Sequence, residues 1–389
     1  MKIFVLTAVI LIVIVSVAGV FLIDTAVAPA VSGPPAVSSE PGLPDPAETP
    51  QPEEPEHSES QEIAGADAID FTKFMIYIEP EPPNTIVTVT ISAAGDVTLG
   101  GDPRGSNQFI REFERNDRDH SVFLRNVKPV FDMSDLSIVN LEGALTESTA
   151  HRARQFVFRG PPHFAKILST GGVDVVTLAN NHTIDFLDRG YRDTIEALEA
   201  EGVAYFGNEF NTIMDVNGIK VGLFGFSVWY DASYIRNNIA SAIEDLKERG
   251  AQVIIGYFHW GFEHVNMPHT YQRNIGRFTI DSGADLLLGA HPHVLQGIEV
   301  YKGKNIVYSL ANFSFGGNNH PADQDTFIFQ QTFTFDNGIL LDTNETNIIP
   351  ARISSVRNRN DFQPILVEGE DAERILRRMD TYSEWVAGW

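Results

Sequence analysis

The sequence has 389 residues, of which 43% are hydrophobic, so it is long enough for one large domain or two small ones. Its formal net charge of -24 at pH 7 argues against binding to nucleic acid through the overall electrostatic field. Cysteine is absent, which excludes disulfides and thiolate ligands, so any metal ion would have to be held by His, Asp, Glu or Asn side chains.

A long apolar segment follows the first two residues. The run from Ile3 to Ile23 contains 21 residues without a charge, and about 20 such residues cross a bilayer as a helix. We therefore predict a transmembrane anchor over residues 1–27. Lys2 favours a cytoplasmic N-terminus, which makes this a single-pass protein of the cell membrane with its C-terminal domain extracellular. Cleavage after the small residues near Ala28 is the alternative, and the proline that follows disfavours it.

The next segment, residues 28–69, is rich in Pro, Glu, Ser and Ala and has almost no aromatic residues. Such a composition buries too little apolar surface to offset the entropy of ordering, so we predict a disordered, extended linker. Asp24–Thr72 holds eleven acidic residues and no Lys or Arg, whereas Lys73–Trp389 has 27 basic and 41 acidic residues. Residues 70–389 are predicted to form the folded domain, which is acidic but less extreme than the whole chain.

Within the folded domain, apolar runs alternate with helical patterns. This alternation predicts an α/β fold with helices covering a sheet. The consecutive strands expected late in the chain suggest a second sheet that contains a hairpin. Strands are predicted for residues 86–96, 136–143, 173–182, 203–207, 219–227, 251–261, 284–293, 297–315 and 326–336, and helices for residues 123–131, 161–172, 189–202, 242–250, 271–283 and 371–379.

Ligand-type side chains follow five of the predicted strands, at the points where the apolar runs stop. Because ligands of open α/β sheets bind outside the carboxyl ends of the strands, these side chains are expected to meet. Oxygen and nitrogen donors of this kind bind divalent metals without cysteine. The strand ends are Gly95-Asp96, Asn140-Leu141-Glu142, Asn180-Asn181-His182, His259-Trp260-Gly261 and His291-Pro292-His293.

Each strand end has a simpler explanation when it is taken alone. Gly95-Asp96 is typical of a turn, and His259 beside a tryptophan is typical of a packed core histidine. The pair His291 and His293 is the most specific, because Pro292 is expected to bias His291 toward an extended backbone and to restrict the loop. The joint pattern, rather than any one motif, predicts a metal site.

These motifs, in this order, resemble the bacterial CapA family of capsule-synthesis proteins, which is linked to poly-gamma-glutamate and looks like a branch of the calcineurin-like metallophosphoesterases. The resemblance covers Val87 to Phe315. It implies an α/β, metallophosphatase-like layered sandwich of two mixed β-sheets flanked by helices. The matching blocks are SAAGDVTLG, SIVNLEG, FVFRGPP, VVTLANNHTID, HWGFE, LLLGAHPHVLQG and IVYSLANFSF.

The resemblance also assigns roles to single residues. It makes His182 the catalytic histidine and implies one or two divalent ions, with Mn, Zn and Fe not distinguished. One ion would take Glu142, Asn181, His259 and His291, and the other would take Asp96, Glu142 and His293. The sequence departs from the superfamily pattern at one position, since Thr98 stands where a histidine ligand is expected.

Four further residues near these motifs have two interpretations each. Asp185 could orient His182 or begin the next helix, and Arg159 could contact an anionic substrate or form a surface salt bridge. Glu263 and Asn312 could support the metal ligands or serve as turn and helix-start residues. Asp185 and Arg159 are retained with His182 as candidate catalytic residues.

Three functions remain open on the sequence alone. The first is a membrane-anchored protein of poly-gamma-glutamate capsule synthesis or export, with membrane synthase subunits as partners. The second is an extracellular metal-dependent phosphoesterase or nucleotidase acting on a phosphorylated substrate. The third is a module without catalytic activity that binds an anionic polymer. None of the three involves nucleic acid.

Overall fold

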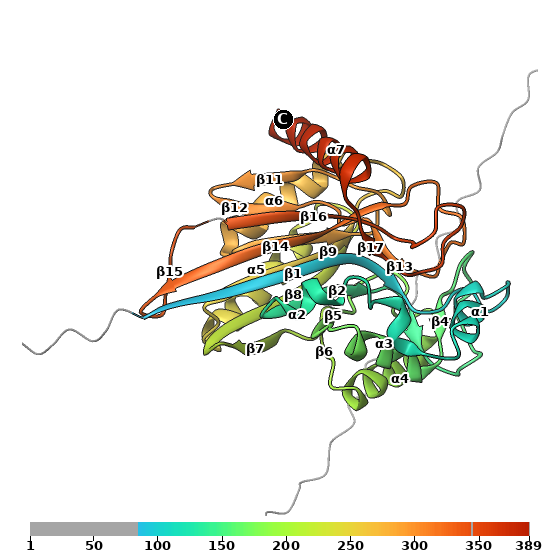
Figure 1. The fold of residues 1–389 in the computed structure, drawn as a ribbon. Helices are drawn as coiled ribbons and strands as arrows, with labels where there is room; N and C mark the ends of the chain where they lie inside the picture. The colour runs from blue at the N-terminus through green and yellow to red at the C-terminus, as the bar shows by residue number, and fades with distance from the viewer. Residues whose placement is uncertain (1–84, 344, 389) are drawn as a thin grey trace, which may run out of the picture. The chain divides into compact units, whose positions relative to one another are not determined.

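The computed structural model describes residues 85–343 and 345–388, and Figure 1 shows their arrangement. The chain separates into two units, Met1–Tyr77 and Ile78–Trp389, and everything below concerns the second. The predicted anchor, 1–27, and linker, 28–69, lie outside the described residues and stay predictions. No helix within the described ranges is both long enough and apolar enough to cross a membrane.

The first sheet is built around β1 (Ile86–Thr98), which lies at its centre (Figure 1). β1 pairs in parallel with β2 (Leu136–Leu141) and antiparallel with β14 (Asp325–Asp336). The order is β17-β16-β14-β1-β2-β5-β6, with β13 joined to β1 and β15 to β14. The remaining strands are β5 (Val175–Thr177), β6 (Ala204–Phe206), β13 (Asn312–Phe315), β15 (Ile339–Leu340), β16 (Glu345–Arg352) and β17 (Ile365–Leu366).

The second sheet has the order β11-β12-β10-β9-β8-β7. Its inner strands run in parallel, whereas β7 and β11 pair antiparallel at its two edges. A short separate ladder joins β3 (Ala144–Leu145) to β4 (Arg159–Gly160). The strands of the second sheet are β7 (Thr212–Val216), β8 (Ile219–Val228), β9 (Val253–Trp260), β10 (Leu286–Ala290), β11 (Ile298–Tyr301) and β12 (Lys304–Val307).

The largest core lies between the two sheets. Successive side chains of a strand point to opposite faces, and β1 follows this rule up to Ala94: Val89 and Ile91 pack with Leu223 of β8 and Ile255 of β9, whereas Ala94 packs in the core on the other side. Burying such side chains contributes about 25 cal/mol per Å² of apolar surface. The inter-sheet core thus fixes how the strand ends of both sheets meet.

Helices cover the outer face of each sheet, which gives the mixed α/β fold expected from the sequence. Apolar residues of α5 (Ser233–Glu248) and α6 (Thr270–Ser282) pack on the second sheet. The first sheet is covered by apolar residues of α1 (Gln108–Arg115), η2 (His120–Phe123), α2 (Lys128–Asp132), η3 (Pro162–Phe164), α3 (Ala165–Thr170) and α4 (Leu187–Ala200).

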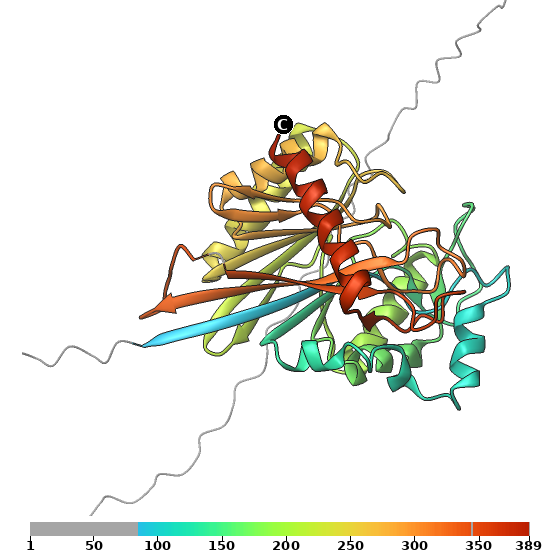
Figure 2. The ribbon, with the colours of Figure 1, turned by 45° about the horizontal axis from the view of Figure 1, so that its top comes forward.

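The last helix, α7 (Gly369–Ala387), crosses strands of both sheets (Figure 2). It packs against β11 of the second sheet and against β14 and β16 of the first. Ile375 and Met379 enter the inter-sheet core, and the Ser383 hydroxyl accepts a hydrogen bond from the Ile298 amide at 2.9 Å. The helix therefore covers the sandwich on one side and is longer than the predicted segment 371–379.

The predicted arrangement of the late strands is wrong in one respect. The hairpin of β11 and β12 does belong to the second sheet, but β14, β15, β16 and β17 join the first sheet beside β1. The physical reason is the long antiparallel pairing of β14 with β1, from Ile86 opposite Asp336 to Ala93 opposite Phe329. The elements not predicted are α1, β3, β4, β7, β15, β16 and β17.

Candidate metal centre

The five strand ends come together where the two sheets meet. Asp96 lies in β1, while Glu142 follows β2 and Asn181 follows β5, all in the first sheet. His259 lies near the end of β9, and His291 directly follows β10, both in the second sheet. The predicted ligands therefore reach a common site from two separate sheets.

A close backbone approach places Asp96. Gly95 lies so near the Ala311 carbonyl that a Cβ atom would come within 1.8 Å of its oxygen. The Asp96 amide donates to the same oxygen at 2.9 Å. Any larger residue at position 95 would push β1 away from the turn before β13, so this glycine fixes the position of the Asp96 carboxylate.

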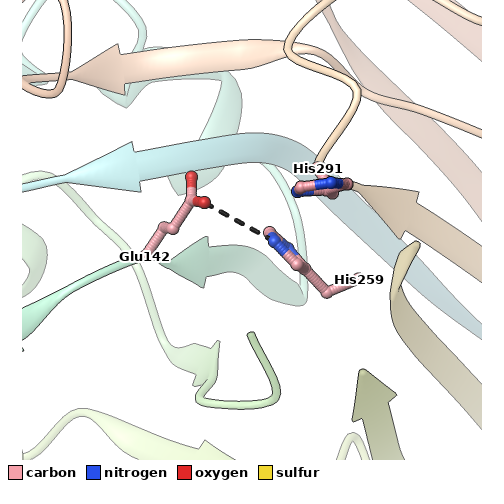
Figure 3. Close-up of side chains that lie close together, drawn as sticks. All are labelled: Glu142, His259 and His291. Atoms are coloured by element: carbon pink, nitrogen blue, oxygen red, sulfur yellow. Dashed lines mark ion pairs between the residues drawn. The ribbon is translucent and has the colours of Figure 1, made fainter. Parts of the chain in front are cut away.

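Two groups of side chains share Glu142. Glu142, His259 and His291 form one group, and Asp96, Glu142 and His293 form the other; within each group the potential ligand atoms lie within 4.8 Å of one another. Figure 3 shows the first group converging, with Glu142 Oε1 3.5 Å from His259 Nε2. In the second group, His293 Nδ1 lies 3.0 Å from an Asp96 oxygen. These residues could hold a metal ion.

Asn181 completes the predicted set. Its Oδ1 atom lies 2.9 Å from His259 Nε2, the nitrogen that also faces Glu142. All six predicted ligands are thus close together: Asp96, Glu142, Asn181, His259, His291 and His293.

Glu142 is the most unusual residue of the site. Its side chain is fully buried, and neither carboxylate oxygen has a hydrogen-bond partner among the described residues. Burial, together with the negative charge of Asp96, raises the pKa of Glu142 well above its ordinary value. Buried polar groups are nearly always satisfied, and a lone buried carboxylate is costly. The two free oxygens and the surrounding imidazoles fit a divalent cation.

The histidines of the site differ in charge state. Burial and the neighbouring His291 lower the pKa of His259 well below its usual value, and burial and His293 lower that of His291 to about 3. Burial also disfavours the charged form of His293, but Glu142 and Asp96 outweigh it and raise the pKa of His293 to about 10. His259 and His291 are therefore neutral at pH 7, the form in which imidazole binds metals.

The backbone of the His-Pro-His turn is not extended as predicted. His291 has a φ of 96° and His293 a φ of 57°, so the expectation drawn from Pro292 is wrong for His291. Such conformations cost about 1–3 kcal/mol each and persist only where the surroundings enforce them. Here the His291 amide lies 3.4 Å from an Asp96 oxygen, to which it donates. The turn directs both imidazoles into the site at the expense of backbone strain.

A chain of buried amides joins the ligands from behind, and the sequence did not assign it. Asn140 Nδ2 donates to Asp96 Oδ1 at 2.8 Å and lies 3.2 Å from His259 Nδ1. Asn180 Nδ2 donates to Asn140 Oδ1 at 3.0 Å. Groups that hydrogen-bond metal ligands orient them. An amide side chain between the apolar residues Val139 and Leu141 of strand β2 was the available signal for Asn140.

His182 is held by a carboxylate on its far side. Its Nδ1 lies 2.6 Å from Asp185 Oδ2, and Asp185 is fully buried. Asp185 also accepts hydrogen bonds from the Phe158 amide at 2.8 Å and from Arg154 Nη1 at 2.9 Å. Asp185 therefore has the geometry of a residue that orients His182, whereas α4 begins two residues later, at Leu187.

Arg159 does not turn toward the ligands. Its Nη1 donates to the Thr146 carbonyl at 3.0 Å and lies 3.8 Å from Glu147, and its guanidinium lies over the Phe186 ring. The arginine beside the site is Arg154, which donates to the Asn181 carbonyl and to Asp185. Sequence reasoning did not select it.

Three other residues of the sequence analysis lie at the site. Glu263 forms a third group of potential ligands with His291 and His293. Asn312 Oδ1 lies 2.9 Å from His293 Nδ1. Thr98, at the position of the expected histidine, is buried, and its hydroxyl has no hydrogen-bond partner among the described residues.

The fold and the site define a mixed α/β protein whose strand ends carry buried carboxylate and histidine groups that could bind a metal ion. The family model described as bacterial capsule synthesis protein PGA_cap matches residues 90–317, which is more than half of the chain, so the chain belongs to this family. The resemblance to CapA proteins seen in the sequence is confirmed.

Curated relatives agree with this assignment. The chain is similar to the "Capsule biosynthesis protein CapA" of Bacillus anthracis, with 28% identity over 58% of this chain and 60% of that protein. It is also similar to the "PGA biosynthesis protein CapA" of Bacillus subtilis strain 168, with 27% identity over 58% of this chain and 63% of that protein. The match thus spans less than two thirds of either relative.

Among solved structures, a hypothetical protein from Thermus thermophilus aligns with 67% of this chain and 99% of its own, at 17% identity and a TM-score of 0.42.

Proposed function

We propose that this protein acts in the synthesis or export of a capsule polymer of the poly-gamma-glutamate type, and that its folded domain carries a metal-dependent hydrolytic site. The observation that carries the metal site is Glu142 at the end of the first sheet, a fully buried carboxylate whose two oxygens have no hydrogen-bond partner among the described residues while the carboxylate faces His259 and His293 of the second sheet. The capsule role rests on the family and on what its relatives are named for.

The residues proposed to hold metal fall into two positions that share Glu142. Asn181, His259 and His291 would complete one position, and Asp96 and His293 the other. A divalent ion held here would supply Lewis-acid polarisation of a phosphoryl or acyl oxygen. Without thiolates, the donor set suits Mn, Zn and Fe alike.

His182 is the proposed proton donor. Its Nδ1 is engaged by Asp185, which leaves Nε2 as the nitrogen that can exchange a proton with a substrate. The side chain lines a cavity that also reaches His293 and Asn312. A histidine in this position can protonate the group that leaves during hydrolysis. Asp185 holds the ring orientation, and Arg154 keeps Asp185 in place.

The proposed setting follows the sequence prediction. The domain would lie outside the cell, attached to the membrane by residues 1–27, and would work with membrane synthase subunits on an anionic polymer or a phosphorylated precursor. A second candidate, an extracellular phosphoesterase or nucleotidase, is favoured by the pair of His182 with buried Asp185, which is suited to protonating a leaving group. The domain proposed here resembles the metallophosphatases in either case.

Hydrolysis of an aryl phosphate tests the hydrolytic site. The metal-loaded protein should hydrolyse it, chelation should abolish the reaction, and His182→Asn should lower kcat by about 10²-fold or more because general acid catalysis is lost. His163→Asn is the matched control, since His163 is exposed on η3 and lies outside the site. Metal-dependent hydrolysis that His182→Asn leaves unchanged would refute the role of His182. A metal-loaded protein without hydrolytic activity would restrict the proposal to a binding role.

A further inference from the structure

Two cavities that share no lining residue adjoin the proposed metal site. The first, of about 330 Å³, is lined by His182, His293 and Asn312 among others. The second, of about 820 Å³, is lined by Asn181 and Trp229 among others. The site can therefore be reached from two directions, and the chemistry of the two cavities differs.

Aromatic rings form the wall of the first cavity. The Phe158 ring lies 4.2 Å from the His182 ring, and the Phe315 ring lies 4.8 Å from the His293 ring, measured between centroids. The two phenylalanines contact each other edge to face at 6.2 Å. The other apolar residues of the lining are Phe156, Val294, Pro321 and Ala322. The space next to the proposed proton donor is thus predominantly apolar.

The first cavity has no Lys or Arg in its lining. Apart from histidines, its titratable lining residues are the acidic Glu263 and Asp323. Asp323 is already paired with Arg378, whose Nη1 lies 2.9 Å away, and no Lys or Arg pairs with Glu263 in the described part of the chain. An anionic group placed beside Glu263 and Asp323 would lose hydration without gaining an Arg or Lys partner.

The second cavity is polar and carries charges of both signs. Its lining includes Arg152 and Arg154 as well as Asp188 and Glu209. Arg154 is fixed by Asp185 and by the Asn181 carbonyl, whereas Arg152 is exposed and makes no ion pair among the described residues. Of the two cavities, only the second has arginine side chains in its lining.

An exposed ring marks the entrance to the first cavity. Phe156 is 54% exposed although it stacks on Phe158 with 6.5 Å between the ring centroids. Apolar surface that continues from an exposed ring into a cavity is typical of a ligand site. The ring is thus placed to cover an apolar group that has entered.

From the chemical difference between the two cavities we infer that the substrate is amphipathic. An anionic group at the metal site carries an uncharged apolar group, such as an aryl, alkyl or acyl chain, that enters the cavity between Phe158 and Phe315. The polar remainder extends past Asn181 toward Arg152. This inference rests on the proposed function, because it requires an anionic group to bind at the metal.

Binding of three phosphonates by calorimetry tests the inference. Phenylphosphonate, 4-phosphonobenzoate and methylphosphonate present the same anionic group to the metal-loaded protein. Phenylphosphonate should bind about tenfold more tightly than methylphosphonate because its ring is buried. It should also bind about tenfold more tightly than 4-phosphonobenzoate, whose added carboxylate would be desolvated without a partner.

A matched pair of variants locates the effect. Phe156→Ser should weaken phenylphosphonate binding several-fold and leave methylphosphonate binding unchanged. Phe262→Ser should change neither, since Phe262 is the same residue type, is similarly exposed at 52% and contacts His269 and Tyr271 instead of the cavity. Equal affinity for all three phosphonates, or tighter binding of the carboxylate, would overturn the inference and leave the metal site intact. Failure of every phosphonate to bind metal-loaded protein would instead refute the proposed function.

Discussion

At the scale of single residues, the proposed metal site contains features that lower the stability of the metal-free protein. Glu142 is buried without a hydrogen-bond partner among the described residues, and His291 and His293 hold left-handed backbone conformations. Each feature destabilises the metal-free fold, and binding of a cation between the proposed ligands would offset these costs. When an unsatisfied buried carboxylate and strained backbone conformations occur together at one place, they indicate a functional site.

Replacing Glu142 separates these two effects. Glu142→Gln should abolish or greatly weaken metal binding and should stabilise the metal-free protein by about 1 kcal/mol, because it removes the cost of burying an ionisable carboxyl group. Glu147→Gln, at a side chain that is 75% exposed, should change neither property. Urea unfolding with chelator present measures the stability. A metal-free Glu142→Gln protein less stable than wild type would contradict this explanation.

Metal binding should release protons. In the metal-free protein the pKa of His293 is raised to about 10, so this imidazole is charged between about pH 6 and pH 9 and must lose its proton to become a ligand. Affinity should therefore increase as pH rises through this range, with about one proton released per ion bound at the Asp96 and His293 position. Calorimetry in buffers of different ionisation enthalpy measures the number of protons released per ion bound. Binding that is independent of pH would contradict the assignment of His293.

The same pKa shifts predict how the stability of the metal-free protein changes with pH. The groups Glu142 and His293 both bind protons more tightly in the folded state than in the unfolded state. For His293, the stabilising contribution is complete below its unfolded pKa, about 6.5, and is lost as pH rises toward about 10. The metal-free protein should become less stable over that interval, and thermal unfolding with chelator present checks this.

At the scale of elements, the apolar strands were predictable and the peripheral ones were not. Strands such as β9 and β10 are continuous buried runs, and such runs can be recognised in the sequence by their apolar composition. By contrast, β16 is largely exposed along its first half and contains Pro350, so its pattern resembles a loop. The pairing of β14 with β1 joins residues from opposite ends of the described domain, and a pairing that distant has no local signal.

Helix α7 also shapes the wall of the apolar cavity. Arg378 binds Asp323, which lines that cavity, and also Asp325 at the start of β14. Arg378 is only 24% exposed, and Asp325 only 8%. The helix lies beyond residues 90–317, the part that matches the family. The segment after the matched region therefore supports the site from outside it.

Removing this support should be measurable. Arg378→Met should lower the free energy of unfolding by about 1–3 kcal/mol, because it deprives Asp323 and Asp325 of a charged hydrogen-bond donor. Arg377→Met on the same helix is the control: its side chain is 68% exposed and, among the residues that the structure describes, pairs only with exposed Glu373. Its effect should therefore stay within about 0.5 kcal/mol. Equal effects of the two variants in urea unfolding would contradict the supporting role of Arg378.

At the scale of the whole molecule, the predicted anchor determines where the site would work. Residues 1–27 lie outside the described part, so membrane attachment remains a prediction from the apolar run Ile3 to Ile23. The full-length protein should remain with washed membranes after cell lysis. Recovery of a soluble chain that begins near Pro29 would contradict a retained anchor and favour cleavage.

The site itself was largely predictable, for two separate reasons. Strand ends that carry ligand-type residues pointed to Asp96, Glu142 and the histidines, and the family resemblance added their roles. The backbone strain at His291 and the contact of Arg154 with Asp185 had no signal in the sequence, and the amide chain through Asn140 had only an amide residue in β2 as a signal. These features depend on contacts between segments that lie apart in the chain, and no single segment of sequence encodes such contacts.

The metal content of the purified protein tests the central claim most directly. Elemental analysis after removal of loosely bound ions should find one or two equivalents of Mn, Zn or Fe in the wild type. The double variant His291→Ala, His293→Ala should have lost most of this metal, while His163→Ala should retain it. A wild-type protein that is free of metal, binds none on addition of these ions and is nevertheless fully stable would contradict the account.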